Sequence, residues 1–134
     1  MRFLIVQNPD MALVLVPWFV PVDQAREDIY LDLIHRLKYN PDETFVCLAI
    51  ENDLIKGMVI AYCRIKDVFI WQVRTSKDVS RYIVDLVFNG VCHWARSRGF
   101  NRVSTVPNRA KKIWQRRWGF RESEENKLEV FKEI

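Results

Sequence analysis

The hydrophobic positions of this chain switch between a helical and an extended period, and each switch marks an expected element. Over residues 23–39, apolar side chains recur four positions apart, which predicts a helix with one buried face. We expect Asp23 to cap this helix and Asn40-Pro41 to stop it, because a residue before proline disfavours helical backbone. Over residues 80–98, a wide apolar stripe predicts a second helix that lies mostly against a core and ends at Gly99.

Three extended apolar runs lie between these two helices. They are Thr44–Glu51, Leu54–Ile65 and Val68–Thr75, separated by the turn signals Asn52-Asp53 and Lys66-Asp67. Short turns between successive strands favour hairpins, so the three runs predict an antiparallel meander.

Shorter segments complete the expected order of elements. We expect strands at Phe3–Val6, Ala12–Val16, Asn101–Val106, Phe120–Glu122 and Leu128–Lys132. A last helix is expected between Asn108, its candidate N-cap, and Gly119. The strand before the long helix and the strand after it can pair in parallel through a right-handed crossover. The sequence therefore predicts one α+β domain, residues 1–134, with a mixed, mostly antiparallel sheet flanked by helices.

The composition is that of a packed globular chain. Of the 134 residues, 49% are hydrophobic and 13% are aromatic, and disordered chains have far fewer such residues. Cys47, Cys63 and Cys92 each lie among apolar residues and form no CxxC pair, so we expect reduced, buried thiols in a cytoplasmic protein. The apolar run 11–20 contains a proline and is too short to span a bilayer, and no signal-peptide cleavage pattern is seen.

The span 96–121 is basic and contains no acidic residue, in a chain of net charge +4. Its cations are Arg96, Arg98, Arg102, Arg109, Lys111, Lys112, Arg116, Arg117 and Arg121. Three interpretations stay open: a solvated basic face, a site for the phosphates of a small anionic cofactor, or phosphate contacts with nucleic acid. Trp114 and Trp118 lie one helical turn apart, and we expect both to pack on the sheet.

Several local segments, in this order of elements, resemble the GNAT acyltransferase superfamily. The meander CLAIENDLIKGMVIAYCRI resembles the second and third strands of that family, and HWARSRG resembles the end of its main helix. NRVSTVPN is similar to the fifth strand, and RRWGF to the last helix running into the sixth strand. The resemblance covers most of the chain and implies a GNAT-like fold for residues 1–134.

The resemblance implies acetyl-CoA, or another CoA, as the cofactor. The fourth and fifth strands of the family splay apart around the pantetheine arm, so the backbone near Val73 would lie beside the thioester. The N-terminus of the main helix, here within residues 79–84, would hold the pyrophosphate on unpaired N–H groups. Asn108 matches the asparagine that meets the pantetheine arm in that family.

The pyrophosphate loop departs from the family pattern. The family loop is rich in glycine, which lets the backbone approach the phosphates closely. This chain has VSRYIV there, with Tyr82 and Val84 at the expected glycine positions. Either the side chains of Lys77, Ser80 and Arg81 replace part of the backbone cradle, or the site has been lost.

A second departure concerns the acid that protonates the departing CoA thiolate. The family often uses a tyrosine, and counting from Asn108 and from Gly119 places Gln115 at that position. A glutamine donates a hydrogen bond but is no general acid. The candidates left for this role are Ser104, Thr105, a tyrosine from elsewhere, or water.

Candidates for the base that deprotonates an acceptor amine are weaker. His35 lies on the first predicted helix, which borders the acceptor site in the family, and three carboxylates lie near strand ends: Glu43, Glu51 and Asp67. The two histidines and scattered cysteines make a poor metal set, and no cysteine is matched with a base as a thiol nucleophile requires. We therefore expect no metal.

Three functions follow from these observations. The first is an acyl-CoA-dependent N-acyltransferase in which an unidentified amine attacks the thioester directly, with the backbone near Val73 polarising the carbonyl. The second is a catalytically inactive GNAT-like binding or assembly module, favoured by the glycine-free loop and Gln115 together. The third is a nucleic-acid-binding protein using the basic 96–121 span. No membrane partner is expected, and a monomer and a homodimer are both compatible with the sequence.

Overall fold

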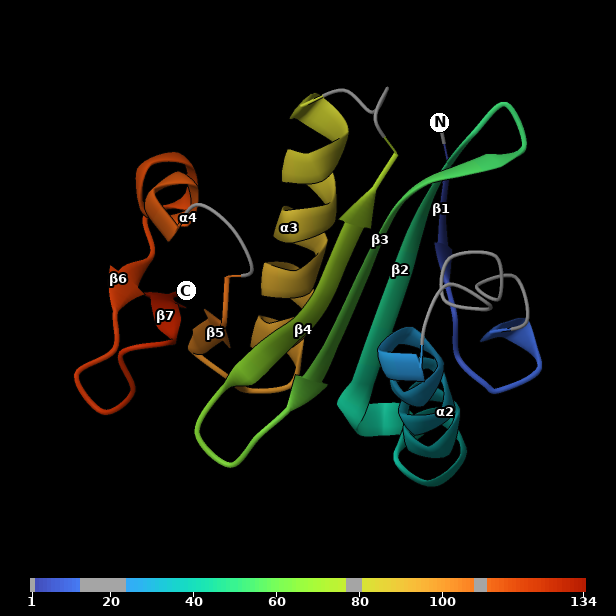
Figure 1. The fold of residues 1–134 in the computed structure, drawn as a ribbon, viewed down its shortest axis with the longest axis horizontal. Helices are drawn as coiled ribbons and strands as arrows, with labels where there is room; N and C mark the ends of the chain where they lie inside the picture. The colour runs from blue at the N-terminus through green and yellow to red at the C-terminus, as the bar shows by residue number, and fades with distance from the viewer. Residues whose placement is uncertain (1, 13–23, 77–80, 108–110) are drawn as a thin grey trace.

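A single seven-stranded sheet organises the chain (Figure 1). The computed structural model describes residues 2–12, 24–76, 81–107 and 111–134, with the backbone alone at 24–26, 81–83 and 111. The spatial order of the strands is β1-β2-β3-β4-β5-β7-β6. Their bounds are Arg2–Ile5 for β1, Thr44–Glu51 for β2, Leu54–Cys63 for β3, Val68–Thr75 for β4, Arg102–Thr105 for β5, Arg121–Glu122 for β6 and Val130–Glu133 for β7.

The strand pairing confirms the predicted fold class. Only β4 and β5 pair in parallel, while every other described pair is antiparallel, which gives the mixed sheet that the element order predicts. The long helix α3, Arg81–Ser97, makes the crossover between β4 and β5. The other helices are α2, Gln24–Tyr39, and α4, Lys111–Trp118, with a short 3-10 turn, η2, at Pro41–Glu43.

Most bounds of the helices and strands differ from the predicted ones by no more than two residues, and two of the differences have a local cause. Met11 and Ala12 lie in a helical turn, in which the Ala12 N–H donates to the Pro9 carbonyl at 3.1 Å, so the predicted strand does not begin there. The rest of that predicted strand, residues 13–16, lies outside the described residues. Strand β3 ends at Cys63 because the Arg64 N–H already donates to the Asp67 carbonyl at 2.7 Å, closing the hairpin.

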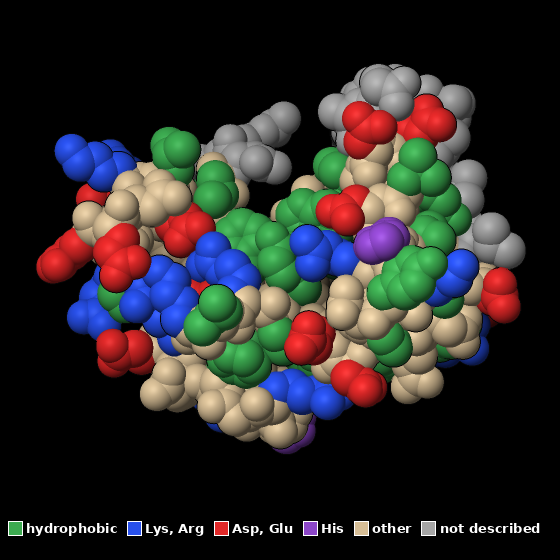
Figure 2. All heavy atoms as spheres, turned by 90° about the horizontal axis from the view of Figure 1, so that it is seen from below, with side chains coloured by type: hydrophobic (Ala, Val, Ile, Leu, Met, Phe, Trp, Pro, Cys, Tyr) green, Lys and Arg blue, Asp and Glu red, His purple; other side chains and the backbone are tan. Residues whose placement is uncertain are grey.

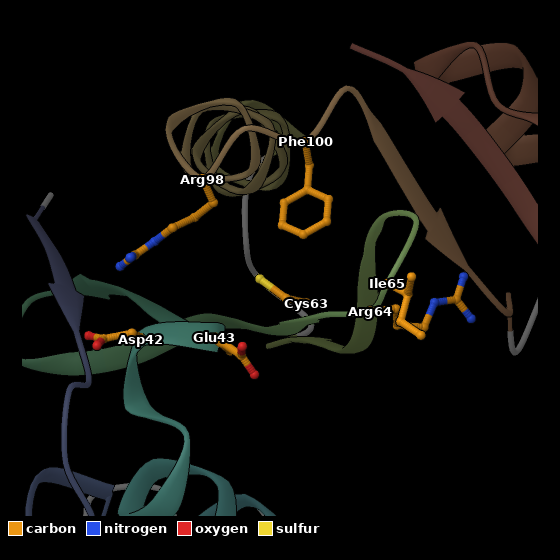
Figure 3. A pocket seen from close by; sticks show the side chains of 7 residues that line it. All are labelled: Asp42, Glu43, Cys63, Arg64, Ile65, Arg98 and Phe100. Carbon is orange, nitrogen blue, oxygen red and sulfur yellow. The ribbon is translucent and has the colours of Figure 1, made fainter.

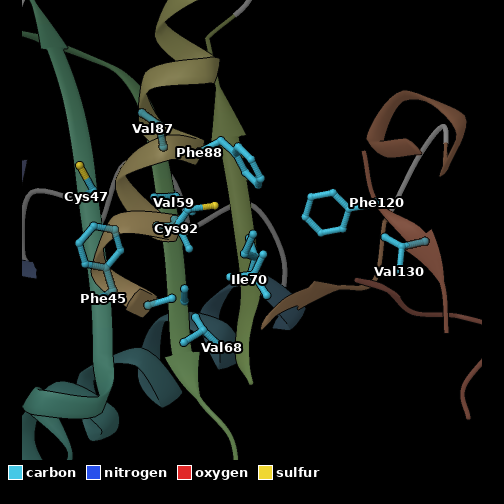
Figure 4. Packing of buried hydrophobic residues seen from close by; sticks show 14 of the residues in the cluster. Phe45, Cys47, Val59, Val68, Ile70, Val87, Phe88, Cys92, Phe120 and Val130 are labelled. Atoms are coloured by element: carbon cyan, nitrogen blue, oxygen red, sulfur yellow. The ribbon is translucent and has the colours of Figure 1, made fainter. Parts of the chain in front are cut away.

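The helices cover opposite faces of the sheet and create two hydrophobic cores. Helix α2 buries Leu33 and Leu37 against alternate residues of β2 and β3 on one face. Helix α3 buries Val87, Phe88 and Val91 on the other face, together with the intervening strand residues and Phe120 (Figure 4). No helix of the described ranges is long and apolar enough to cross a membrane.

The β2–β3 hairpin turns through two residues with left-handed backbone. Asn52 has φ 53° and Asp53 has φ 61°, the geometry of a type I′ turn, in which glycine is preferred at the second position. We therefore expect Asp53→Gly to raise the free energy of unfolding by about 0.5–1 kcal/mol, because glycine adopts this backbone without a Cβ clash. Urea denaturation measures this change, and a variant less stable than the wild type would contradict the turn assignment.

Candidate functional site

Strand β4 is paired with β5 over only part of its length. Val68, Phe69 and Ile70 pair with Val103, Ser104 and Thr105, and the pairing stops there. At the last pair, the Thr105 hydroxyl donates to the Ile70 carbonyl at 2.9 Å. Beyond Ile70, residues 72–75 of β4 pair with β3 alone, and β4 and β5 diverge in space (Figure 1). The edge of β4 that faces β5 is therefore unpaired with β5 beyond Ile70, although β4 lies in the middle of the sheet.

A β-bulge lies at the point of divergence. Ile60 of β3 pairs with Gln72, and the next residue, Ala61, pairs with Ile70, so Trp71 is an extra residue in β4. A bulge bends its strand and increases the local twist. Trp71 packs against the α2-side core, and Gln72 pairs with Ile60 of that same core, so both side chains lie on the α2 face. The bulge explains why β4 turns away from β5 directly after Ile70.

The residues expected to meet a cofactor divide into those that the structure places and those that it does not. Val73 lies on the diverging part of β4, three positions after the last residue paired with β5, and its side chain is 40% exposed. Arg81 and Tyr82 open α3, which begins at the end of the sheet where β4 finishes (Figure 1), and their backbone alone is described. Lys77, Ser80 and Asn108 lie outside the described residues.

Ser104 belongs to a buried ionic network. Its hydroxyl donates to Asp67 Oδ2 at 2.5 Å, and both side chains are inaccessible to solvent. Arg64 holds the same carboxylate with two hydrogen bonds, at 2.7 and 2.8 Å, and reaches Glu129 with another at 2.8 Å. Asp67 is therefore neither a solvated turn residue nor an accessible base, and the Ser104 proton is engaged with it.

Gln115 and the two tryptophans of α4 lie as the helical spacing predicts. Trp114 and Trp118 pack against the α3-side core, with ring centroids 4.8 Å apart. Gln115, which lies between them in the sequence, is half-buried. Its carbonyl accepts the Gly119 N–H at 3.2 Å, which ends the helix at the expected glycine, whose φ is +73°.

Asp85, which sequence reasoning did not single out, anchors α4 to α3. Its Oδ1 accepts hydrogen bonds from Trp118 Nε1 at 2.9 Å and from Arg117 Nε at 3.0 Å. Arg117 is thus held inward, whereas Lys112 and Arg116 are exposed on the same helix. Asp85 is the last acidic residue before the basic span, and it lies about one turn inside the long helix. This position was the sequence signal that could have indicated a partner for one of the following cations.

We expect Asp85→Ala to lower the free energy of unfolding by about 1–2 kcal/mol, because the half-buried donors on Arg117 and Trp118 lose a common acceptor. Asp85→Asn keeps an acceptor oxygen and serves as the control, with less than half of that loss expected. Chemical denaturation followed by tryptophan fluorescence measures both. Equal losses for the two variants would show that charge rather than hydrogen bonding fixes α4.

The basic span does not form one uninterrupted free face. The guanidinium groups of Arg102 and Arg121 both lie over the ring of Phe131, at 3.7 and 5.0 Å from its centroid. Arg98 faces Trp94 at 5.7 Å from the ring centroid, at the far end of α3. Together with Arg117, four cations of the span are therefore engaged with aromatic rings or carboxylates.

Within the described part of the chain, the cysteines and His35 show no arrangement for covalent catalysis. Burial raises the pKa of Cys47 to about 11, and burial also raises the pKa of Cys92, so both thiols stay protonated at neutral pH. His35 is exposed on α2, with its ring 4.6 Å from that of Tyr39. No group of three metal-ligating side chains occurs within the described ranges.

A cavity of about 560 Å³ lies at the opposite end of the sheet from the diverging strands. Asp42 and Glu43 line it from η2, Cys63 from the end of β3, and Arg98 and Phe100 from the end of α3 (Figure 3). Arg64 also borders it, but its guanidinium points away from Cys63 and Phe100, in keeping with its bonds to Asp67 and Glu129. This cavity is separate from the diverging end of β4.

Comparison with known proteins identifies the fold. The chain has the fold of the GNAT acyltransferases. An acetyltransferase of the GNAT family from Streptococcus pneumoniae matches it with a TM-score of 0.62 and 20% identity, over 99% of this chain and 100% of that one. No family model and no curated protein matches the chain in sequence.

Two other solved structures similar to this chain contain a CoA. The PaiA N-acetyltransferase from Thermoplasma acidophilum, in complex with coenzyme A, matches with a TM-score of 0.71 and 11% identity over 100% of both chains. A predicted acetyltransferase from Clostridium acetobutylicum, with acetyl-CoA, matches with a TM-score of 0.73 and 12% identity, over 93% of this chain and 92% of that one. At these identities the likeness establishes the fold.

Proposed function

We propose that this protein binds acetyl-CoA, or another acyl-CoA, and transfers the acyl group to an amine that attacks the thioester directly. The observation that carries the proposal is the divergence of β4 from β5 at the Trp71 bulge, within a GNAT fold. The CoA and acetyl-CoA bound in similar structures support the same cofactor class. We also propose that residues 1–134 form one domain.

The described residues offer two features that fit a CoA. The backbone of β4 beyond Ile70 has no partner in β5, so its polar groups are available to a pantetheine arm lying between the strands. Helix α3 begins at the same end of the sheet, and its first N–H groups lack helical acceptors, which suits a pyrophosphate. Lys112 and Arg116, exposed on α4, are candidates for the remaining phosphate.

A CoA thioester supplies an activated acyl group. The contribution of the chain is to hold that group beside the β4 backbone near Val73, where an N–H donor stabilises the oxyanion that forms during attack. The side chain of Val73 carries no charge, so this role belongs to the backbone. Because a fixed donor needs no reorganisation during the reaction, the geometry of the bulged strand is itself part of the catalytic apparatus.

Proton transfer is the second task. We assign no acid role to Ser104, because its hydroxyl donates to Asp67 inside a buried network. Gln115 can orient the leaving sulfur through an amide N–H but cannot protonate it. A thiol of ordinary pKa, about 8.5, is a tolerable leaving group without a dedicated acid, so we assign this proton to water.

The test is release of free CoA thiol from acetyl-CoA in the presence of a panel of primary amines, with mass spectrometry of the amines. We expect thiol release that depends on both an amine and the protein, and a mass increase of one acetyl group on the amine. Binding of acetyl-CoA without any turnover would instead favour a catalytically inactive binding module. Absence of both would remove the proposed function.

A further inference from the structure

Beside the bulge, the described residues cover the aromatic side chains of the α2 face only in part. The core under α2 is formed by residues of β1, β2, β3 and α2, with Trp71 packed at its margin. Viewed from below, the molecule is hollowed between the side that carries α2 and the side that carries β6 and β7 (Figure 2). Hydrophobic side chains form the floor of this hollow, and Lys or Arg side chains lie against them (Figure 2).

Aromatic rings from β3 and β4 provide a contiguous apolar surface on this face. The ring of Tyr62 lies 5.5 Å from that of Phe69 and 5.9 Å from that of Trp71, measured between centroids. All three side chains are only half-buried. Contiguous half-exposed rings suit the apolar or aromatic body of a ligand, since aromatic pairs gain from stacked and edge-to-face contacts.

Arg36 of α2 is held against these rings. Its guanidinium carbon lies 3.9 Å from the centroid of Tyr62 and 5.5 Å from that of Trp71, and its side chain is 29% exposed. Asp32, one turn earlier on α2, forms an ion pair with Arg36, but its Oδ2 is 3.6 Å from Nε, which is beyond hydrogen-bond distance. The Nε atom is buried and has no hydrogen-bond partner within the described part of the chain.

This arrangement suits a planar anion. A guanidinium offers a fork of donors that matches a carboxylate, and a fork fixed between aromatic rings loses little freedom when it binds. The other arginines on this face already have partners in part: Arg64 holds Asp67 and Glu129, and Arg74 donates to Gln72 at 3.2 Å.

The position of Arg36 relates it to the proposed chemistry. Trp71, which its guanidinium faces, is the bulge residue at which β4 leaves β5, and Val73 follows two positions later. A ligand whose body lies on Tyr62 and Trp71 is therefore placed beside the diverging strands. The guanidinium also repels a second positive charge, which disfavours polycationic acceptors.

We propose that the acceptor is an amine that also carries a carboxylate on an apolar or aromatic body, and that Arg36 on the Tyr62–Trp71 surface recognises that carboxylate. This inference rests on the proposed acyltransferase function and names the class of its acceptor. Arg36 thus determines which amine binds as acceptor and takes no part in the acyl transfer itself.

The test compares phenylalanine with phenethylamine, which differs from it only by the carboxylate. Binding of each to the full chain is measured by isothermal titration, with and without CoA, and acetyl transfer to each is measured separately. We expect phenylalanine to bind at least about 10-fold more tightly. Arg36→Gln should abolish this difference and Arg36→Lys should retain part of it. Lys38→Gln, which removes an exposed cation from the same helix, should leave it unchanged.

Equal binding of the two amines, tighter binding of phenethylamine, or no binding of either overturns the inference. A preference that survives in a folded Arg36→Gln variant also overturns it, and thermal unfolding monitored by circular dichroism establishes that the variant is folded. Acetyl transfer to both amines at equal efficiency would refute the inference while upholding the proposed function. A carboxylate preference in binding with no transfer to any amine would uphold the recognition of the carboxylate by Arg36 and refute the proposed acyl transfer.

Discussion

Replacing Asp67 with alanine is expected to lower the free energy of unfolding by about 3 kcal/mol, because it breaks a buried ion pair and leaves charged donors without an acceptor. Asp67 is fully buried and accepts hydrogen bonds from Arg64 and Ser104. The loss should lie at the lower end of the range for such pairs, since Arg64 keeps Glu129 as a partner. Guanidinium denaturation measures the change.

The control is Lys66→Gln in the same hairpin. The Lys66–Glu125 pair is 2.8 Å long, but its side chains are 47% and 76% exposed, so we expect a loss of less than about 0.5 kcal/mol. Comparable losses for the two variants would contradict the distinction between the buried and the exposed pair.

The same network predicts a dependence on pH. Burial acts to raise the pKa of Asp67, but hydrogen bonds from Arg64 and Ser104 outweigh burial and lower the pKa below its ordinary value of 3.8. A carboxyl with a depressed folded-state pKa stabilises the native state above its unfolded pKa, about 3.9, and loses that contribution as the pH falls through the folded value. The stability difference between wild type and Asp67→Ala should therefore be constant near neutrality and shrink below about pH 4.

Deleting Trp71 is expected to weaken acetyl-CoA binding by about 10-fold or more, because it removes the bulge that turns β4 away from β5. The deletion leaves every other pair of the β3–β4 ladder in register, since Ile60–Gln72 and Ala61–Ile70 become consecutive. The strand can then follow β5 for longer and close the opening between them. Equilibrium titration with acetyl-CoA measures the affinity.

Trp71→Ala separates the backbone effect from the loss of the ring. This variant keeps the extra residue and hence the bulge, so its acetyl-CoA affinity should stay close to that of the wild type. Its effect should fall instead on amine binding, because Trp71 borders Arg36. Equal losses of acetyl-CoA affinity in the two variants would show that the side chain, and not the bend, makes the site.

The meander was predictable because its signals are local. Extended apolar runs and strong turn residues give the bounds of β2 and β4 as the sequence predicts, and apolar spacing gives the extent of α2 and α3 within one or two residues. The parallel pairing of β4 with β5 followed from chain order and the handedness of crossovers.

The bulge at Trp71 was not predictable, because it exists only relative to the register against β3. The segment VFIWQVRT contains no glycine or proline to mark it, and its side chains suit a regular strand. The role of Asp67 was also hidden. Ser104, which donates to Asp67, lies 37 residues from it, and Glu129, the second carboxylate that Arg64 holds, lies 65 residues from Arg64. A turn position in sequence gives no measure of burial when a distant loop covers the turn.

Arg36 illustrates the same limit for the proposed acceptor site. In sequence it is a charged residue near the end of an amphipathic helix, where a cation is favoured by the helix dipole. Only the packing of α2 on β3 brings it over Tyr62, and only the bulge turns Trp71 to the same face. The candidate site thus depends on contacts between elements that no local pattern encodes.

Isothermal titration of the full chain with acetyl-CoA tests the central claim most directly. We predict saturable binding of one acetyl-CoA per chain with a Kd below about 1 mM, in the range usual for enzyme substrates. Absence of binding heat at millimolar acetyl-CoA, at several temperatures and with a folded protein, would contradict the claim that the diverging strands form a CoA site.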